Sequence, residues 1–376
     1  MTTTVTSPVG ATPDTLLLMT PGPTRVPERV LAAGGAPMIH HRTPAFSRAL
    51  VSVVEGLRPL YGTRSADVLP IHTTGRGALE AAITNLFSPG DEIVSCCNGK
   101  FGEMWAELAG SYGLVAHRVC TDWSRGVEPD EVEQALRDHP RARAVTIAHS
   151  DTSTGVQNDV AAVLALTRSR GILGMVDCIS ALGGIPFSFD EWGADVVVTA
   201  SQKCLMASPG LAFVAVSERA WAAYESARLT RNYWDFGPVR TNLARSQPET
   251  PGTAPVHTFL QLAESLTMIH EEGLRAVFAR HEAMARRVRQ RASTLGFGPL
   301  FPDLGRWSPT MTALRTPKGV DPKLLRQHLV QRGILVAEGL GKYSGLCIRI
   351  GHMGDIRVSD VDRTFDAITG VMAEGR

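Results

Sequence analysis

The sequence predicts an α/β fold with two domains: a large one built on a mainly parallel sheet between helices, and a smaller α+β domain at the C-terminal end. Short β-branched runs alternate with helical patterns along roughly the first 250 residues. Near residue 255 this alternation changes to two long helices and then to short strands. The length of 376 residues also favours two domains, because single cores rarely grow beyond about 300 residues.

The first part of the chain contains β-runs separated by helices, which is typical of parallel strands. The run AVTIA at residues 144–148 is clearly apolar, and Gly171 ends the helical pattern before the next strand. The expected helices are Ala78 to Leu86 and Val160 to Arg170. The expected strands are Glu92 to Ser95, Ala144 to Ala148, Ile172 to Val176, Asp195 to Thr199 and Leu211 to Val216.

The second part of the chain is expected to fold as a helix-rich α+β unit. We expect helices at Thr258 to Glu272, Leu274 to Leu295 and Pro322 to Arg332, and strands at Thr310 to Leu314 and Leu346 to Ile350. We therefore divide the chain into a flexible N-terminal tail (1–15), a large domain (16–260) and a small domain (261–376). The tail is rich in Ser, Thr and Pro and lacks the basic and apolar regions of a signal peptide.

The composition argues against several classes of partner. The 38 basic and 37 acidic residues nearly cancel, which disfavours a dedicated nucleic-acid or membrane surface. No run of eighteen apolar residues predicts a transmembrane helix. The cysteines show no CxxC spacing, so we expect buried, reduced thiols and a cytoplasmic protein. These cysteines are Cys96, Cys97, Cys120, Cys178, Cys204 and Cys347.

Lys203 follows an apolar strand and stands in a loop of small residues, TASQK at 199–203. Such a lysine points at the carboxyl edge of a sheet, where open α/β sheets bind ligands. Apolar neighbours disfavour the ammonium form, and the neutral amine is then a better nucleophile toward an aldehyde. The alternative is a surface lysine at a strand end.

Asp177 follows directly after the strand expected at 172–176. We expect this strand to lie next to the strand that precedes Lys203. A carboxylate at that edge could hold a ring nitrogen protonated. The alternative is a helix N-cap, because Ser180 and Leu182 follow.

The segment His72 to Gly77 (HTTGRG) precedes the helix expected from Ala78. Small residues and backbone N–H groups at a helix N-terminus favour a phosphate site, to which Thr74 and Arg76 could add hydrogen bonds. The third glycine of a dinucleotide-binding motif is missing, which argues against a nucleotide-dependent oxidoreductase. The alternative is a turn followed by an N-cap.

Several motifs, in this order, resemble those of class-V aminotransferases, in particular the alanine–glyoxylate, serine–pyruvate and serine–glyoxylate group. The SQK triplet at 201–203, the aspartate segment at 176–184 and the RIGHMG run at 349–354 are the most specific together. The others are PGP at 21–23, TGR at 74–76, NGKFG at 98–102, HSDTSTG at 149–155 and TPGT at 250–253. The resemblance covers roughly residues 16 to 370.

This resemblance implies a fold-type I enzyme dependent on pyridoxal 5'-phosphate, with a seven-stranded type of sheet in the cofactor-binding domain. It implies that Lys203 forms the Schiff base, that Asp177 binds the pyridine nitrogen and that Arg349 holds the substrate carboxylate. The alternative for Arg349 is a surface arginine that ends a strand. The remaining implied cofactor contacts are Thr74, Gly75, Arg76, Phe101 (stacked on the ring), Ser153 and Gln202, with Thr253 reaching the phosphate of the other subunit in a homodimer.

The resemblance also implies a small amino acid, alanine or serine, as donor and glyoxylate or pyruvate as acceptor. His41, with His40 and Arg42, lies in a segment that often lines the entrance of such sites and is a candidate for substrate binding, although a structural role is the alternative. No second basic anchor can be assigned, which disfavours a dicarboxylate donor.

Three departures from the family pattern leave alternatives open. Thr250 replaces a Tyr that reaches the phosphate in several relatives, Asp151 stands where Glu is common, and Arg76 is larger than the usual residue. A pyridoxamine–pyruvate transaminase, a lyase and a desulfurase remain alternatives with the same fold. A desulfurase needs a cysteine on a mobile loop, and Cys347 lies inside an expected strand. A non-catalytic binding protein is an alternative of a different class, which would predict loss of Lys203 or Asp177.

Overall fold

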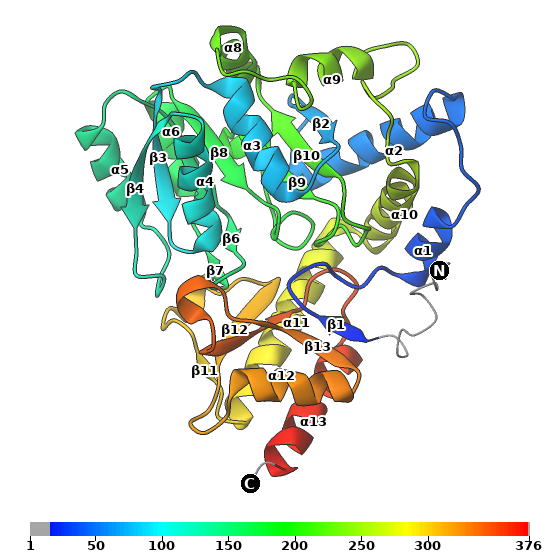
Figure 1. The fold of residues 1–376 in the computed structure, drawn as a ribbon, viewed down its shortest axis with the longest axis vertical. Coiled ribbons are helices and arrows are strands. Elements are labelled where there is room, and N and C mark those ends of the chain that lie inside the picture. Colours follow the sequence, from blue (N-terminus) through cyan, green and yellow to red (C-terminus); the bar gives the residue numbers. More distant parts are fainter. Residues whose placement is uncertain (1–15, 375–376) are drawn as a thin grey trace, which may run out of the picture.

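The computed structural model describes residues 16–374, which form two large sheets and a two-stranded hairpin with helices packed around them (Figure 1). The expected flexible tail at 1–15 lies outside the described residues. The larger sheet has seven strands in the order β2-β10-β9-β8-β5-β3-β4, and only β10 runs antiparallel to its neighbours. These strands are β2 (Asp67–Ile71), β3 (Glu92–Cys97), β4 (Val115–Cys120), β5 (Ala142–Ala148), β8 (Leu173–Asp177), β9 (Val196–Ala200) and β10 (Ala212–Val216). The predicted mainly parallel α/β fold is confirmed.

Helices cover both faces of this sheet, because its central strands are apolar on both sides. In β10, Phe213 and Ala215 point into one core, whereas Ala212, Val214 and Val216 point into the other. The first core is closed by α2 (Pro44–Tyr61), α5 (Pro129–Asp138), α6 (Val160–Ser169) and α10 (Val256–Glu272). The second is closed by α3 (Gly75–Leu86), α4 (Lys100–Ser111), α8 (Glu218–Ser226) and α9 (Phe236–Leu243).

The smaller sheet has five strands in the order β1-β13-β14-β12-β11 and packs on helices of the C-terminal part. Its strands are β1 (Leu17–Met19), β11 (Gly298–Pro299), β12 (Met311–Arg315), β13 (Ile334–Glu338) and β14 (Cys347–Gly351). Its helices are α11 (Leu274–Thr294), α12 (Pro322–Gln331) and α13 (Val358–Glu374). The remaining elements are α1 (Glu28–Gly34), α7 (Phe189–Trp192), the hairpin of β6 (Ser150–Asp151) and β7 (Val156–Gln157), and two 3-10 turns, Leu304–Arg306 and Gly341–Tyr343.

Two structural observations bear on the expected domain division, which stays a prediction. Strand β1 lies in the small sheet, parallel to β13, although residues from 16 onward were assigned to the large domain (Figure 1). The expected boundary at 260/261 falls inside α10, whose Phe259, Leu262 and Leu266 all pack in the core of the large sheet. A continuous helix with one buried face cannot be divided at that point, and the chain leaves it at Gly273.

The cysteines follow the expectation with one exception. All six are free thiols, and five are buried, whereas Cys120 at the end of β4 is exposed. The reason is topological: among residues 16–374 β3 is the only strand next to β4, so the side chains of this edge strand are less covered than those of the central strands. No helix in residues 16–374 is both long and apolar enough to cross a membrane.

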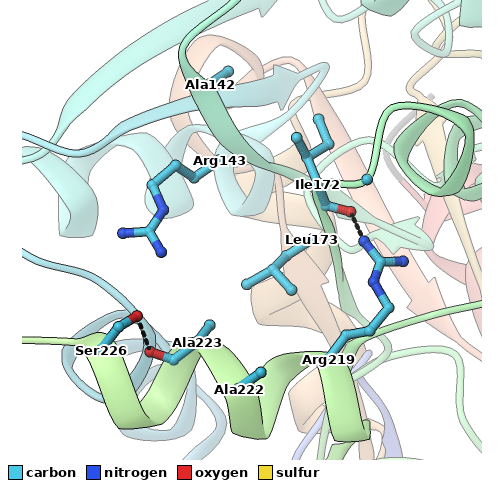
Figure 2. Close-up of a pocket in the computed structure, with 9 residues that line it drawn as sticks. Ala142, Arg143, Ile172, Leu173, Arg219, Ala222, Ala223 and Ser226 are labelled. Atoms are coloured by element: carbon cyan, nitrogen blue, oxygen red, sulfur yellow. Dashed lines mark hydrogen bonds between the residues drawn. The ribbon is translucent and has the colours of Figure 1, made fainter.

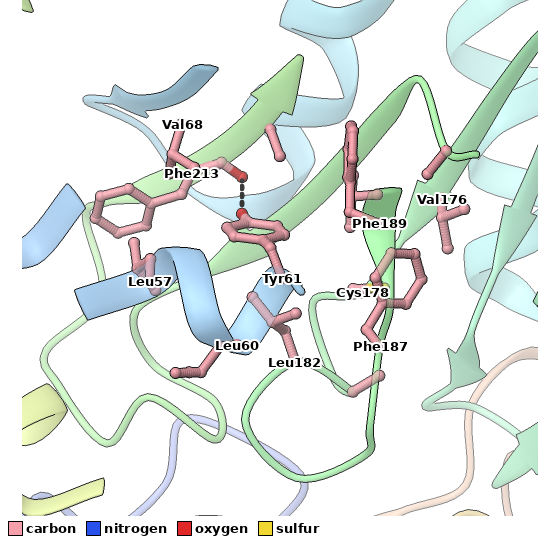
Figure 3. Close-up of a cluster of buried hydrophobic side chains, with 14 of the residues drawn as sticks. Leu57, Leu60, Tyr61, Val68, Val176, Cys178, Leu182, Phe187, Phe189 and Phe213 are labelled. Carbon is pink, nitrogen blue, oxygen red and sulfur yellow. Dashed lines mark hydrogen bonds between the residues drawn. The ribbon is translucent and has the colours of Figure 1, made fainter. Parts of the chain in front are cut away.

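Tyr61, the last residue of α2, joins that helix to β10, the strand next to the edge strand β2. Its ring is fully buried among aromatic and aliphatic side chains, and its hydroxyl donates a hydrogen bond of 3.0 Å to the carbonyl of Phe213 (Figure 3). Burial raises the pKa of this phenol well above its usual value, so the hydroxyl stays protonated as a donor.

Replacing Tyr61 by Phe should lower the free energy of unfolding by about 1–2 kcal/mol, because the buried Phe213 carbonyl loses this donor. Urea denaturation of Tyr61→Phe and wild type measures the difference. Tyr233→Phe is the matched control, since the Tyr233 side chain is 74% exposed and its loss of a hydroxyl should cost almost nothing. Equal stability of all three proteins would show that this hydrogen bond contributes nothing.

Candidate active site

Asp177 and Lys203 meet at the carboxyl edge of the large sheet, as the sequence predicts. Asp177 is the last residue of β8 and pairs with Val198 of the adjacent parallel strand β9. Lys203 follows three residues after β9 ends at Ala200. Because both strands run in the same direction, their ends deliver the two side chains to the same edge.

Lys203 lies against the N-terminal segment that leaves β1. Its ammonium group donates a hydrogen bond to the carbonyl of Pro21, and its backbone carbonyl accepts one of 3.0 Å from the Thr24 hydroxyl. Gly22 has a φ of +107°, and a Cβ there would lie 2.6–2.7 Å from the end of the Lys203 side chain. Only glycine allows this approach.

Desolvation, together with the nearby charge of Arg349, lowers the pKa of Lys203 to about 8, while Asp177 opposes the shift. A substantial neutral fraction is therefore present near pH 8, where an exposed lysine would be almost fully protonated. This protonation behaviour fits a nucleophile or a proton acceptor.

Asp177 is 4% exposed, and burial raises its pKa to about 7. Its Oδ1 accepts a hydrogen bond of 2.7 Å from the backbone N–H of Ile179. No helix begins at this point, so the helix N-cap alternative is wrong. Within residues 16–374 the carboxylate forms no ion pair, which leaves it able to receive a positively charged partner.

Arg349 enters the site from β14 of the small sheet. Its side chain is only 7% exposed, so it is not a surface arginine. The Nε atom donates to the Glu338 carbonyl at 2.6 Å, and Nη1 donates to the Thr152 carbonyl at 2.9 Å. Burial lowers its pKa to about 10, which still leaves it charged at neutral pH. In the described part of the chain Nη2 makes no hydrogen bond, so the outer edge of the guanidinium can still receive a carboxylate.

The predicted phosphate loop forms the N-terminus of α3, which begins at Gly75 rather than at Ala78. Thr74 is the N-cap residue, and no side chain within residues 16–374 caps this helix end. The first intrahelical bond runs from the Ala78 N–H to the Thr74 carbonyl, so the preceding N–H groups of the first turn point out of the helix. Thr74 and Arg76 are exposed beside them.

Asp151 is a central residue of this region that the sequence did not reveal. Its side chain is fully buried; Oδ2 accepts hydrogen bonds from the N–H groups of Phe101 (3.0 Å) and Gly102 (3.1 Å) in the first turn of α4. Oδ1 accepts bonds from the Ser153 N–H (2.9 Å) and hydroxyl (2.5 Å). A Cβ on Gly99 would lie 2.2–2.4 Å from this carboxylate, so glycine is required there.

Ser153 and Phe101 are both held through Asp151. The Ser153 hydroxyl donates to Asp151 and accepts a bond of 2.9 Å from the Lys100 N–H, and the side chain is fully buried. These contacts give Ser153 a role inside the protein that the sequence did not indicate. Phe101 is half-buried at the second position of α4, where the Asp151 contact fixes its backbone.

The other predicted site residues, Gln202, Thr253 and His41, differ in how far they are buried. Gln202 carries a side-chain oxygen that is buried without a hydrogen-bond partner in the described chain. Thr253 is exposed in the segment before α10. His41 is half-buried, and its ring is tilted by 31° against that of His40 with centroids 4.5 Å apart. Burial lowers the pKa of His72 beside the phosphate loop to about 4, and the charge of His41 adds to this shift.

A separate hollow of about 420 Å³ opens at the opposite edge of the sheet (Figure 2). It lies between the amino ends of β5 and β8 and helix α8, and two arginines line it, Arg143 and Arg219. Arg143 already pairs with Asp91 at 2.7 Å, and Arg219 lies 3.5 Å from Asp195 and donates to the Ile172 carbonyl. With both guanidinium groups occupied, this hollow offers little to an anionic ligand.

Replacing Asp151 by Ala should lower the free energy of unfolding by about 2–4 kcal/mol, because it leaves two N–H groups of α4 and the Ser153 hydroxyl without their acceptor. Thermal and urea unfolding measure the change. Asp130→Ala, at an exposed position in the first turn of α5, is the control and should cost a few tenths of a kcal/mol. Equal losses in the two variants would contradict the capping role of Asp151.

Known proteins resemble this chain over nearly its whole length. It is 39% identical over 365 residues to a protein named soluble hydrogenase small subunit of Synechococcus, covering 96% of this chain and 94% of that relative. It is 38% identical to the L-aspartate–glyoxylate aminotransferase of Paracoccus denitrificans, covering 89% of this chain and 86% of the relative.

The fold of the chain is also similar to that of a solved structure. The alanine–glyoxylate aminotransferase from Nostoc superimposes with a TM-score of 0.92 at 30% identity, covering 96% of this chain and 97% of that one. The family model described as aminotransferase class-V matches residues 17–361. The sequence prediction of a transaminase is confirmed, and the chain belongs to the class-V aminotransferase family.

Proposed function

We propose that this enzyme uses pyridoxal 5'-phosphate to transfer the amino group of alanine or serine to glyoxylate or pyruvate. The observation that carries the proposal is the meeting of three ionisable groups: buried Asp177 and partly buried Lys203 after adjacent strands, and buried Arg349 from the small sheet. The names of the similar proteins from Paracoccus and Nostoc support glyoxylate as an acceptor.

The residues present fit pyridoxal phosphate at both of its charged ends. The uncapped first turn of α3 offers backbone N–H groups to a phosphate, and Thr74 and Arg76 stand exposed beside it. At the other end the buried carboxylate of Asp177 has no ion-pair partner among residues 16–374, and a protonated ring nitrogen would supply that partner. When bound, the cofactor supplies a ring that withdraws electrons from the substrate carbon.

Lys203 has two tasks in this proposal. Its neutral amine would hold the cofactor through the cofactor's aldehyde group, with loss of water, and the same amine, once free, would take the proton from the substrate α-carbon. The pKa of about 8 serves both tasks, since the neutral form is present near neutral pH. Asp177 must be ionised to hold the ring nitrogen protonated, and a cationic partner lowers the pKa that burial raises.

Arg349 orients the substrate by its carboxylate. Two of its nitrogen atoms are anchored to the backbone carbonyls of Glu338 and Thr152, so the planar group is held rigidly before substrate arrives. Because Glu338 lies in β13 of the small sheet and Thr152 follows β6, the same arginine links the small sheet to the β6–β7 hairpin beside the reacting centre.

We include in this proposal a homodimer and a reducing compartment such as the cytoplasm. Because Thr253 is exposed in the single chain, its hydroxyl could reach the phosphate that a second subunit binds. All six cysteines are free thiols, which suits reducing conditions.

His41 and Arg76 are proposed to line the entrance, where Arg76 would contact an anionic group of the cofactor or substrate.

The visible absorption spectrum of the purified protein with pyridoxal phosphate tests this function. The wild type should show the band of bound cofactor, lose it on addition of L-alanine or L-serine, and regain it with glyoxylate or pyruvate. Lys203→Ala should lack the cycle because it has no amine at the reacting carbon. L-Aspartate and pyridoxamine are the comparison donors.

The outcome separates the alternatives. Cycling with pyridoxamine instead of amino acids would identify a pyridoxamine–pyruvate transaminase, and cycling with aspartate alone would contradict the small-donor assignment. A protein that stays colourless in excess pyridoxal phosphate would overturn the cofactor assignment.

Replacing Arg349 by Lys should lower kcat/KM for the amino donor by about 100-fold, mainly through a higher KM, because an ammonium group cannot form a two-point contact with a carboxylate. Steady-state kinetics with L-alanine measure the change. Arg326→Lys is the control: this guanidinium also reaches a backbone carbonyl, that of Val336, but its ion pair is with Glu338. An unchanged KM in Arg349→Lys would exclude Arg349 as the carboxylate ligand.

A further inference from the structure

Three potential metal ligands converge on the outer edge of the large sheet, away from the candidate active site. Glu92 is the first residue of β3, His117 lies within β4, and His139 follows the end of α5. One ligand atom from each lies within 4.8 Å of the others, and this is the only such group of three among residues 16–374.

The geometry of the cluster is well defined. His117 Nε2 lies 2.9 Å from Glu92 Oε2, and the rings of His117 and His139 stack with centroids 3.4 Å apart and 9° between their planes. The side chains are partly buried: those of Glu92 and His117 are 11% and 20% exposed. The three elements that carry them are in mutual contact, since α5 packs on both β3 and β4.

The register of the sheet explains why the ligands meet. Glu92 pairs with Val115 and Val94 pairs with His117 across the parallel strands, so Glu92 and His117 lie diagonally on one face. Val94 of that face and Val132 and Leu136 of α5 belong to the same core, which places the end of α5 over the two strands. His139 is thereby brought onto the ring of His117.

We propose that Glu92, His117 and His139 form a binding site for a divalent transition metal ion of the zinc class. Two imidazoles and one carboxylate are a common ligand set for zinc, with water in the fourth position. Ligand atoms around tetrahedral zinc are about 3.3 Å apart. Because an ion lies in the plane of each imidazole that binds it, one of the two stacked rings must turn out of the stack for both to bind.

The site has a structural role rather than a catalytic one. Glu92 stands at the amino end of β3, whereas Asp177 and Lys203 stand at the carboxyl edge of the same sheet. Strand β4 has only one neighbouring strand, and much of it is exposed. An ion held by β3, β4 and the end of α5 would fasten this edge to the rest of the sheet.

One cation competes with the metal ion. Arg141, whose side chain is 85% exposed, donates to Glu92 Oε1 at 2.5 Å. The competition is weak because an exposed guanidinium is well solvated and can turn away at little cost. Removal of Arg141 should therefore strengthen metal binding, whereas removal of a ligand should weaken it.

Isothermal titration of the holoenzyme with ZnCl2 in a non-chelating buffer, after removal of any affinity tag, tests the site. We expect the wild type to bind one zinc ion per chain, with a thermal unfolding midpoint raised by about 2–4 °C at saturation. His139→Ala should weaken binding by about 100-fold and abolish the rise, and Arg141→Ala should tighten binding by about 2- to 5-fold.

His328→Ala is the matched control, because His328 is an exposed histidine on α12 and its loss should change neither the affinity nor the midpoint. Glu92→Gln provides a second ligand variant that keeps the shape of the side chain. Wild-type affinity in both His139→Ala and Glu92→Gln, or no binding by the wild type at micromolar zinc, would overturn the proposal. Transaminase activity plays no part in this readout, so failure of the proposed function would leave it intact.

Discussion

Burial of four ionisable side chains at one edge of a parallel sheet is the constraint on which the rest of the active site depends. Asp151, Asp177 and Arg349 are buried and Lys203 is partly buried, and desolvation shifts each pKa in the direction that favours the neutral form. Such groups are costly unless they are hydrogen-bonded or paired. In this protein, hydrogen bonds with backbone groups offset part of this cost, and they do so without neutralising every charge.

The two sheets are joined through the same set of contacts. Arg349 from the small sheet donates to the Thr152 carbonyl of the large domain. The segment after β1 crosses in the other direction, because the Pro21 carbonyl accepts from Lys203. Gly351 allows this crossing, since a Cβ there would lie 2.2 Å from the Thr20 carbonyl oxygen. The position of the small sheet therefore sets the surroundings of the reacting lysine, and the N-terminal strand is part of the active-site architecture.

Much of the site was predictable because its residues follow strands. Lys203 and Asp177 come after β-branched runs, and strand ends are recognisable from composition and from the order of the motifs. Asp151 was not predictable in its role, because the N–H groups that it binds lie about 50 residues away in α4 and a cap of this kind has no local signal. The roles of Ser153 and Phe101 depend on that same long-range contact.

The fold shows the same division between local and long-range information. Helix α10 and helix α11 were expected nearly at their observed bounds, since both have long periodic apolar faces. The placement of β1 in the small sheet was missed because three residues carry too little pattern, and only pairing with β13 defines the strand. The domain boundary stays a prediction for a related reason: a change in composition marks where elements differ, whereas the packing of Phe259 and Leu262 decides to which core helix α10 belongs.

The central claim is that Lys203 is the residue that carries the cofactor at the edge shared with Asp177. Borohydride reduction of the protein with pyridoxal phosphate, followed by peptide mapping in a mass spectrometer, tests it most directly. The account predicts one stable adduct per chain, on the peptide that contains Lys203. An adduct confined to any other lysine, or none in protein that remains folded, would contradict it.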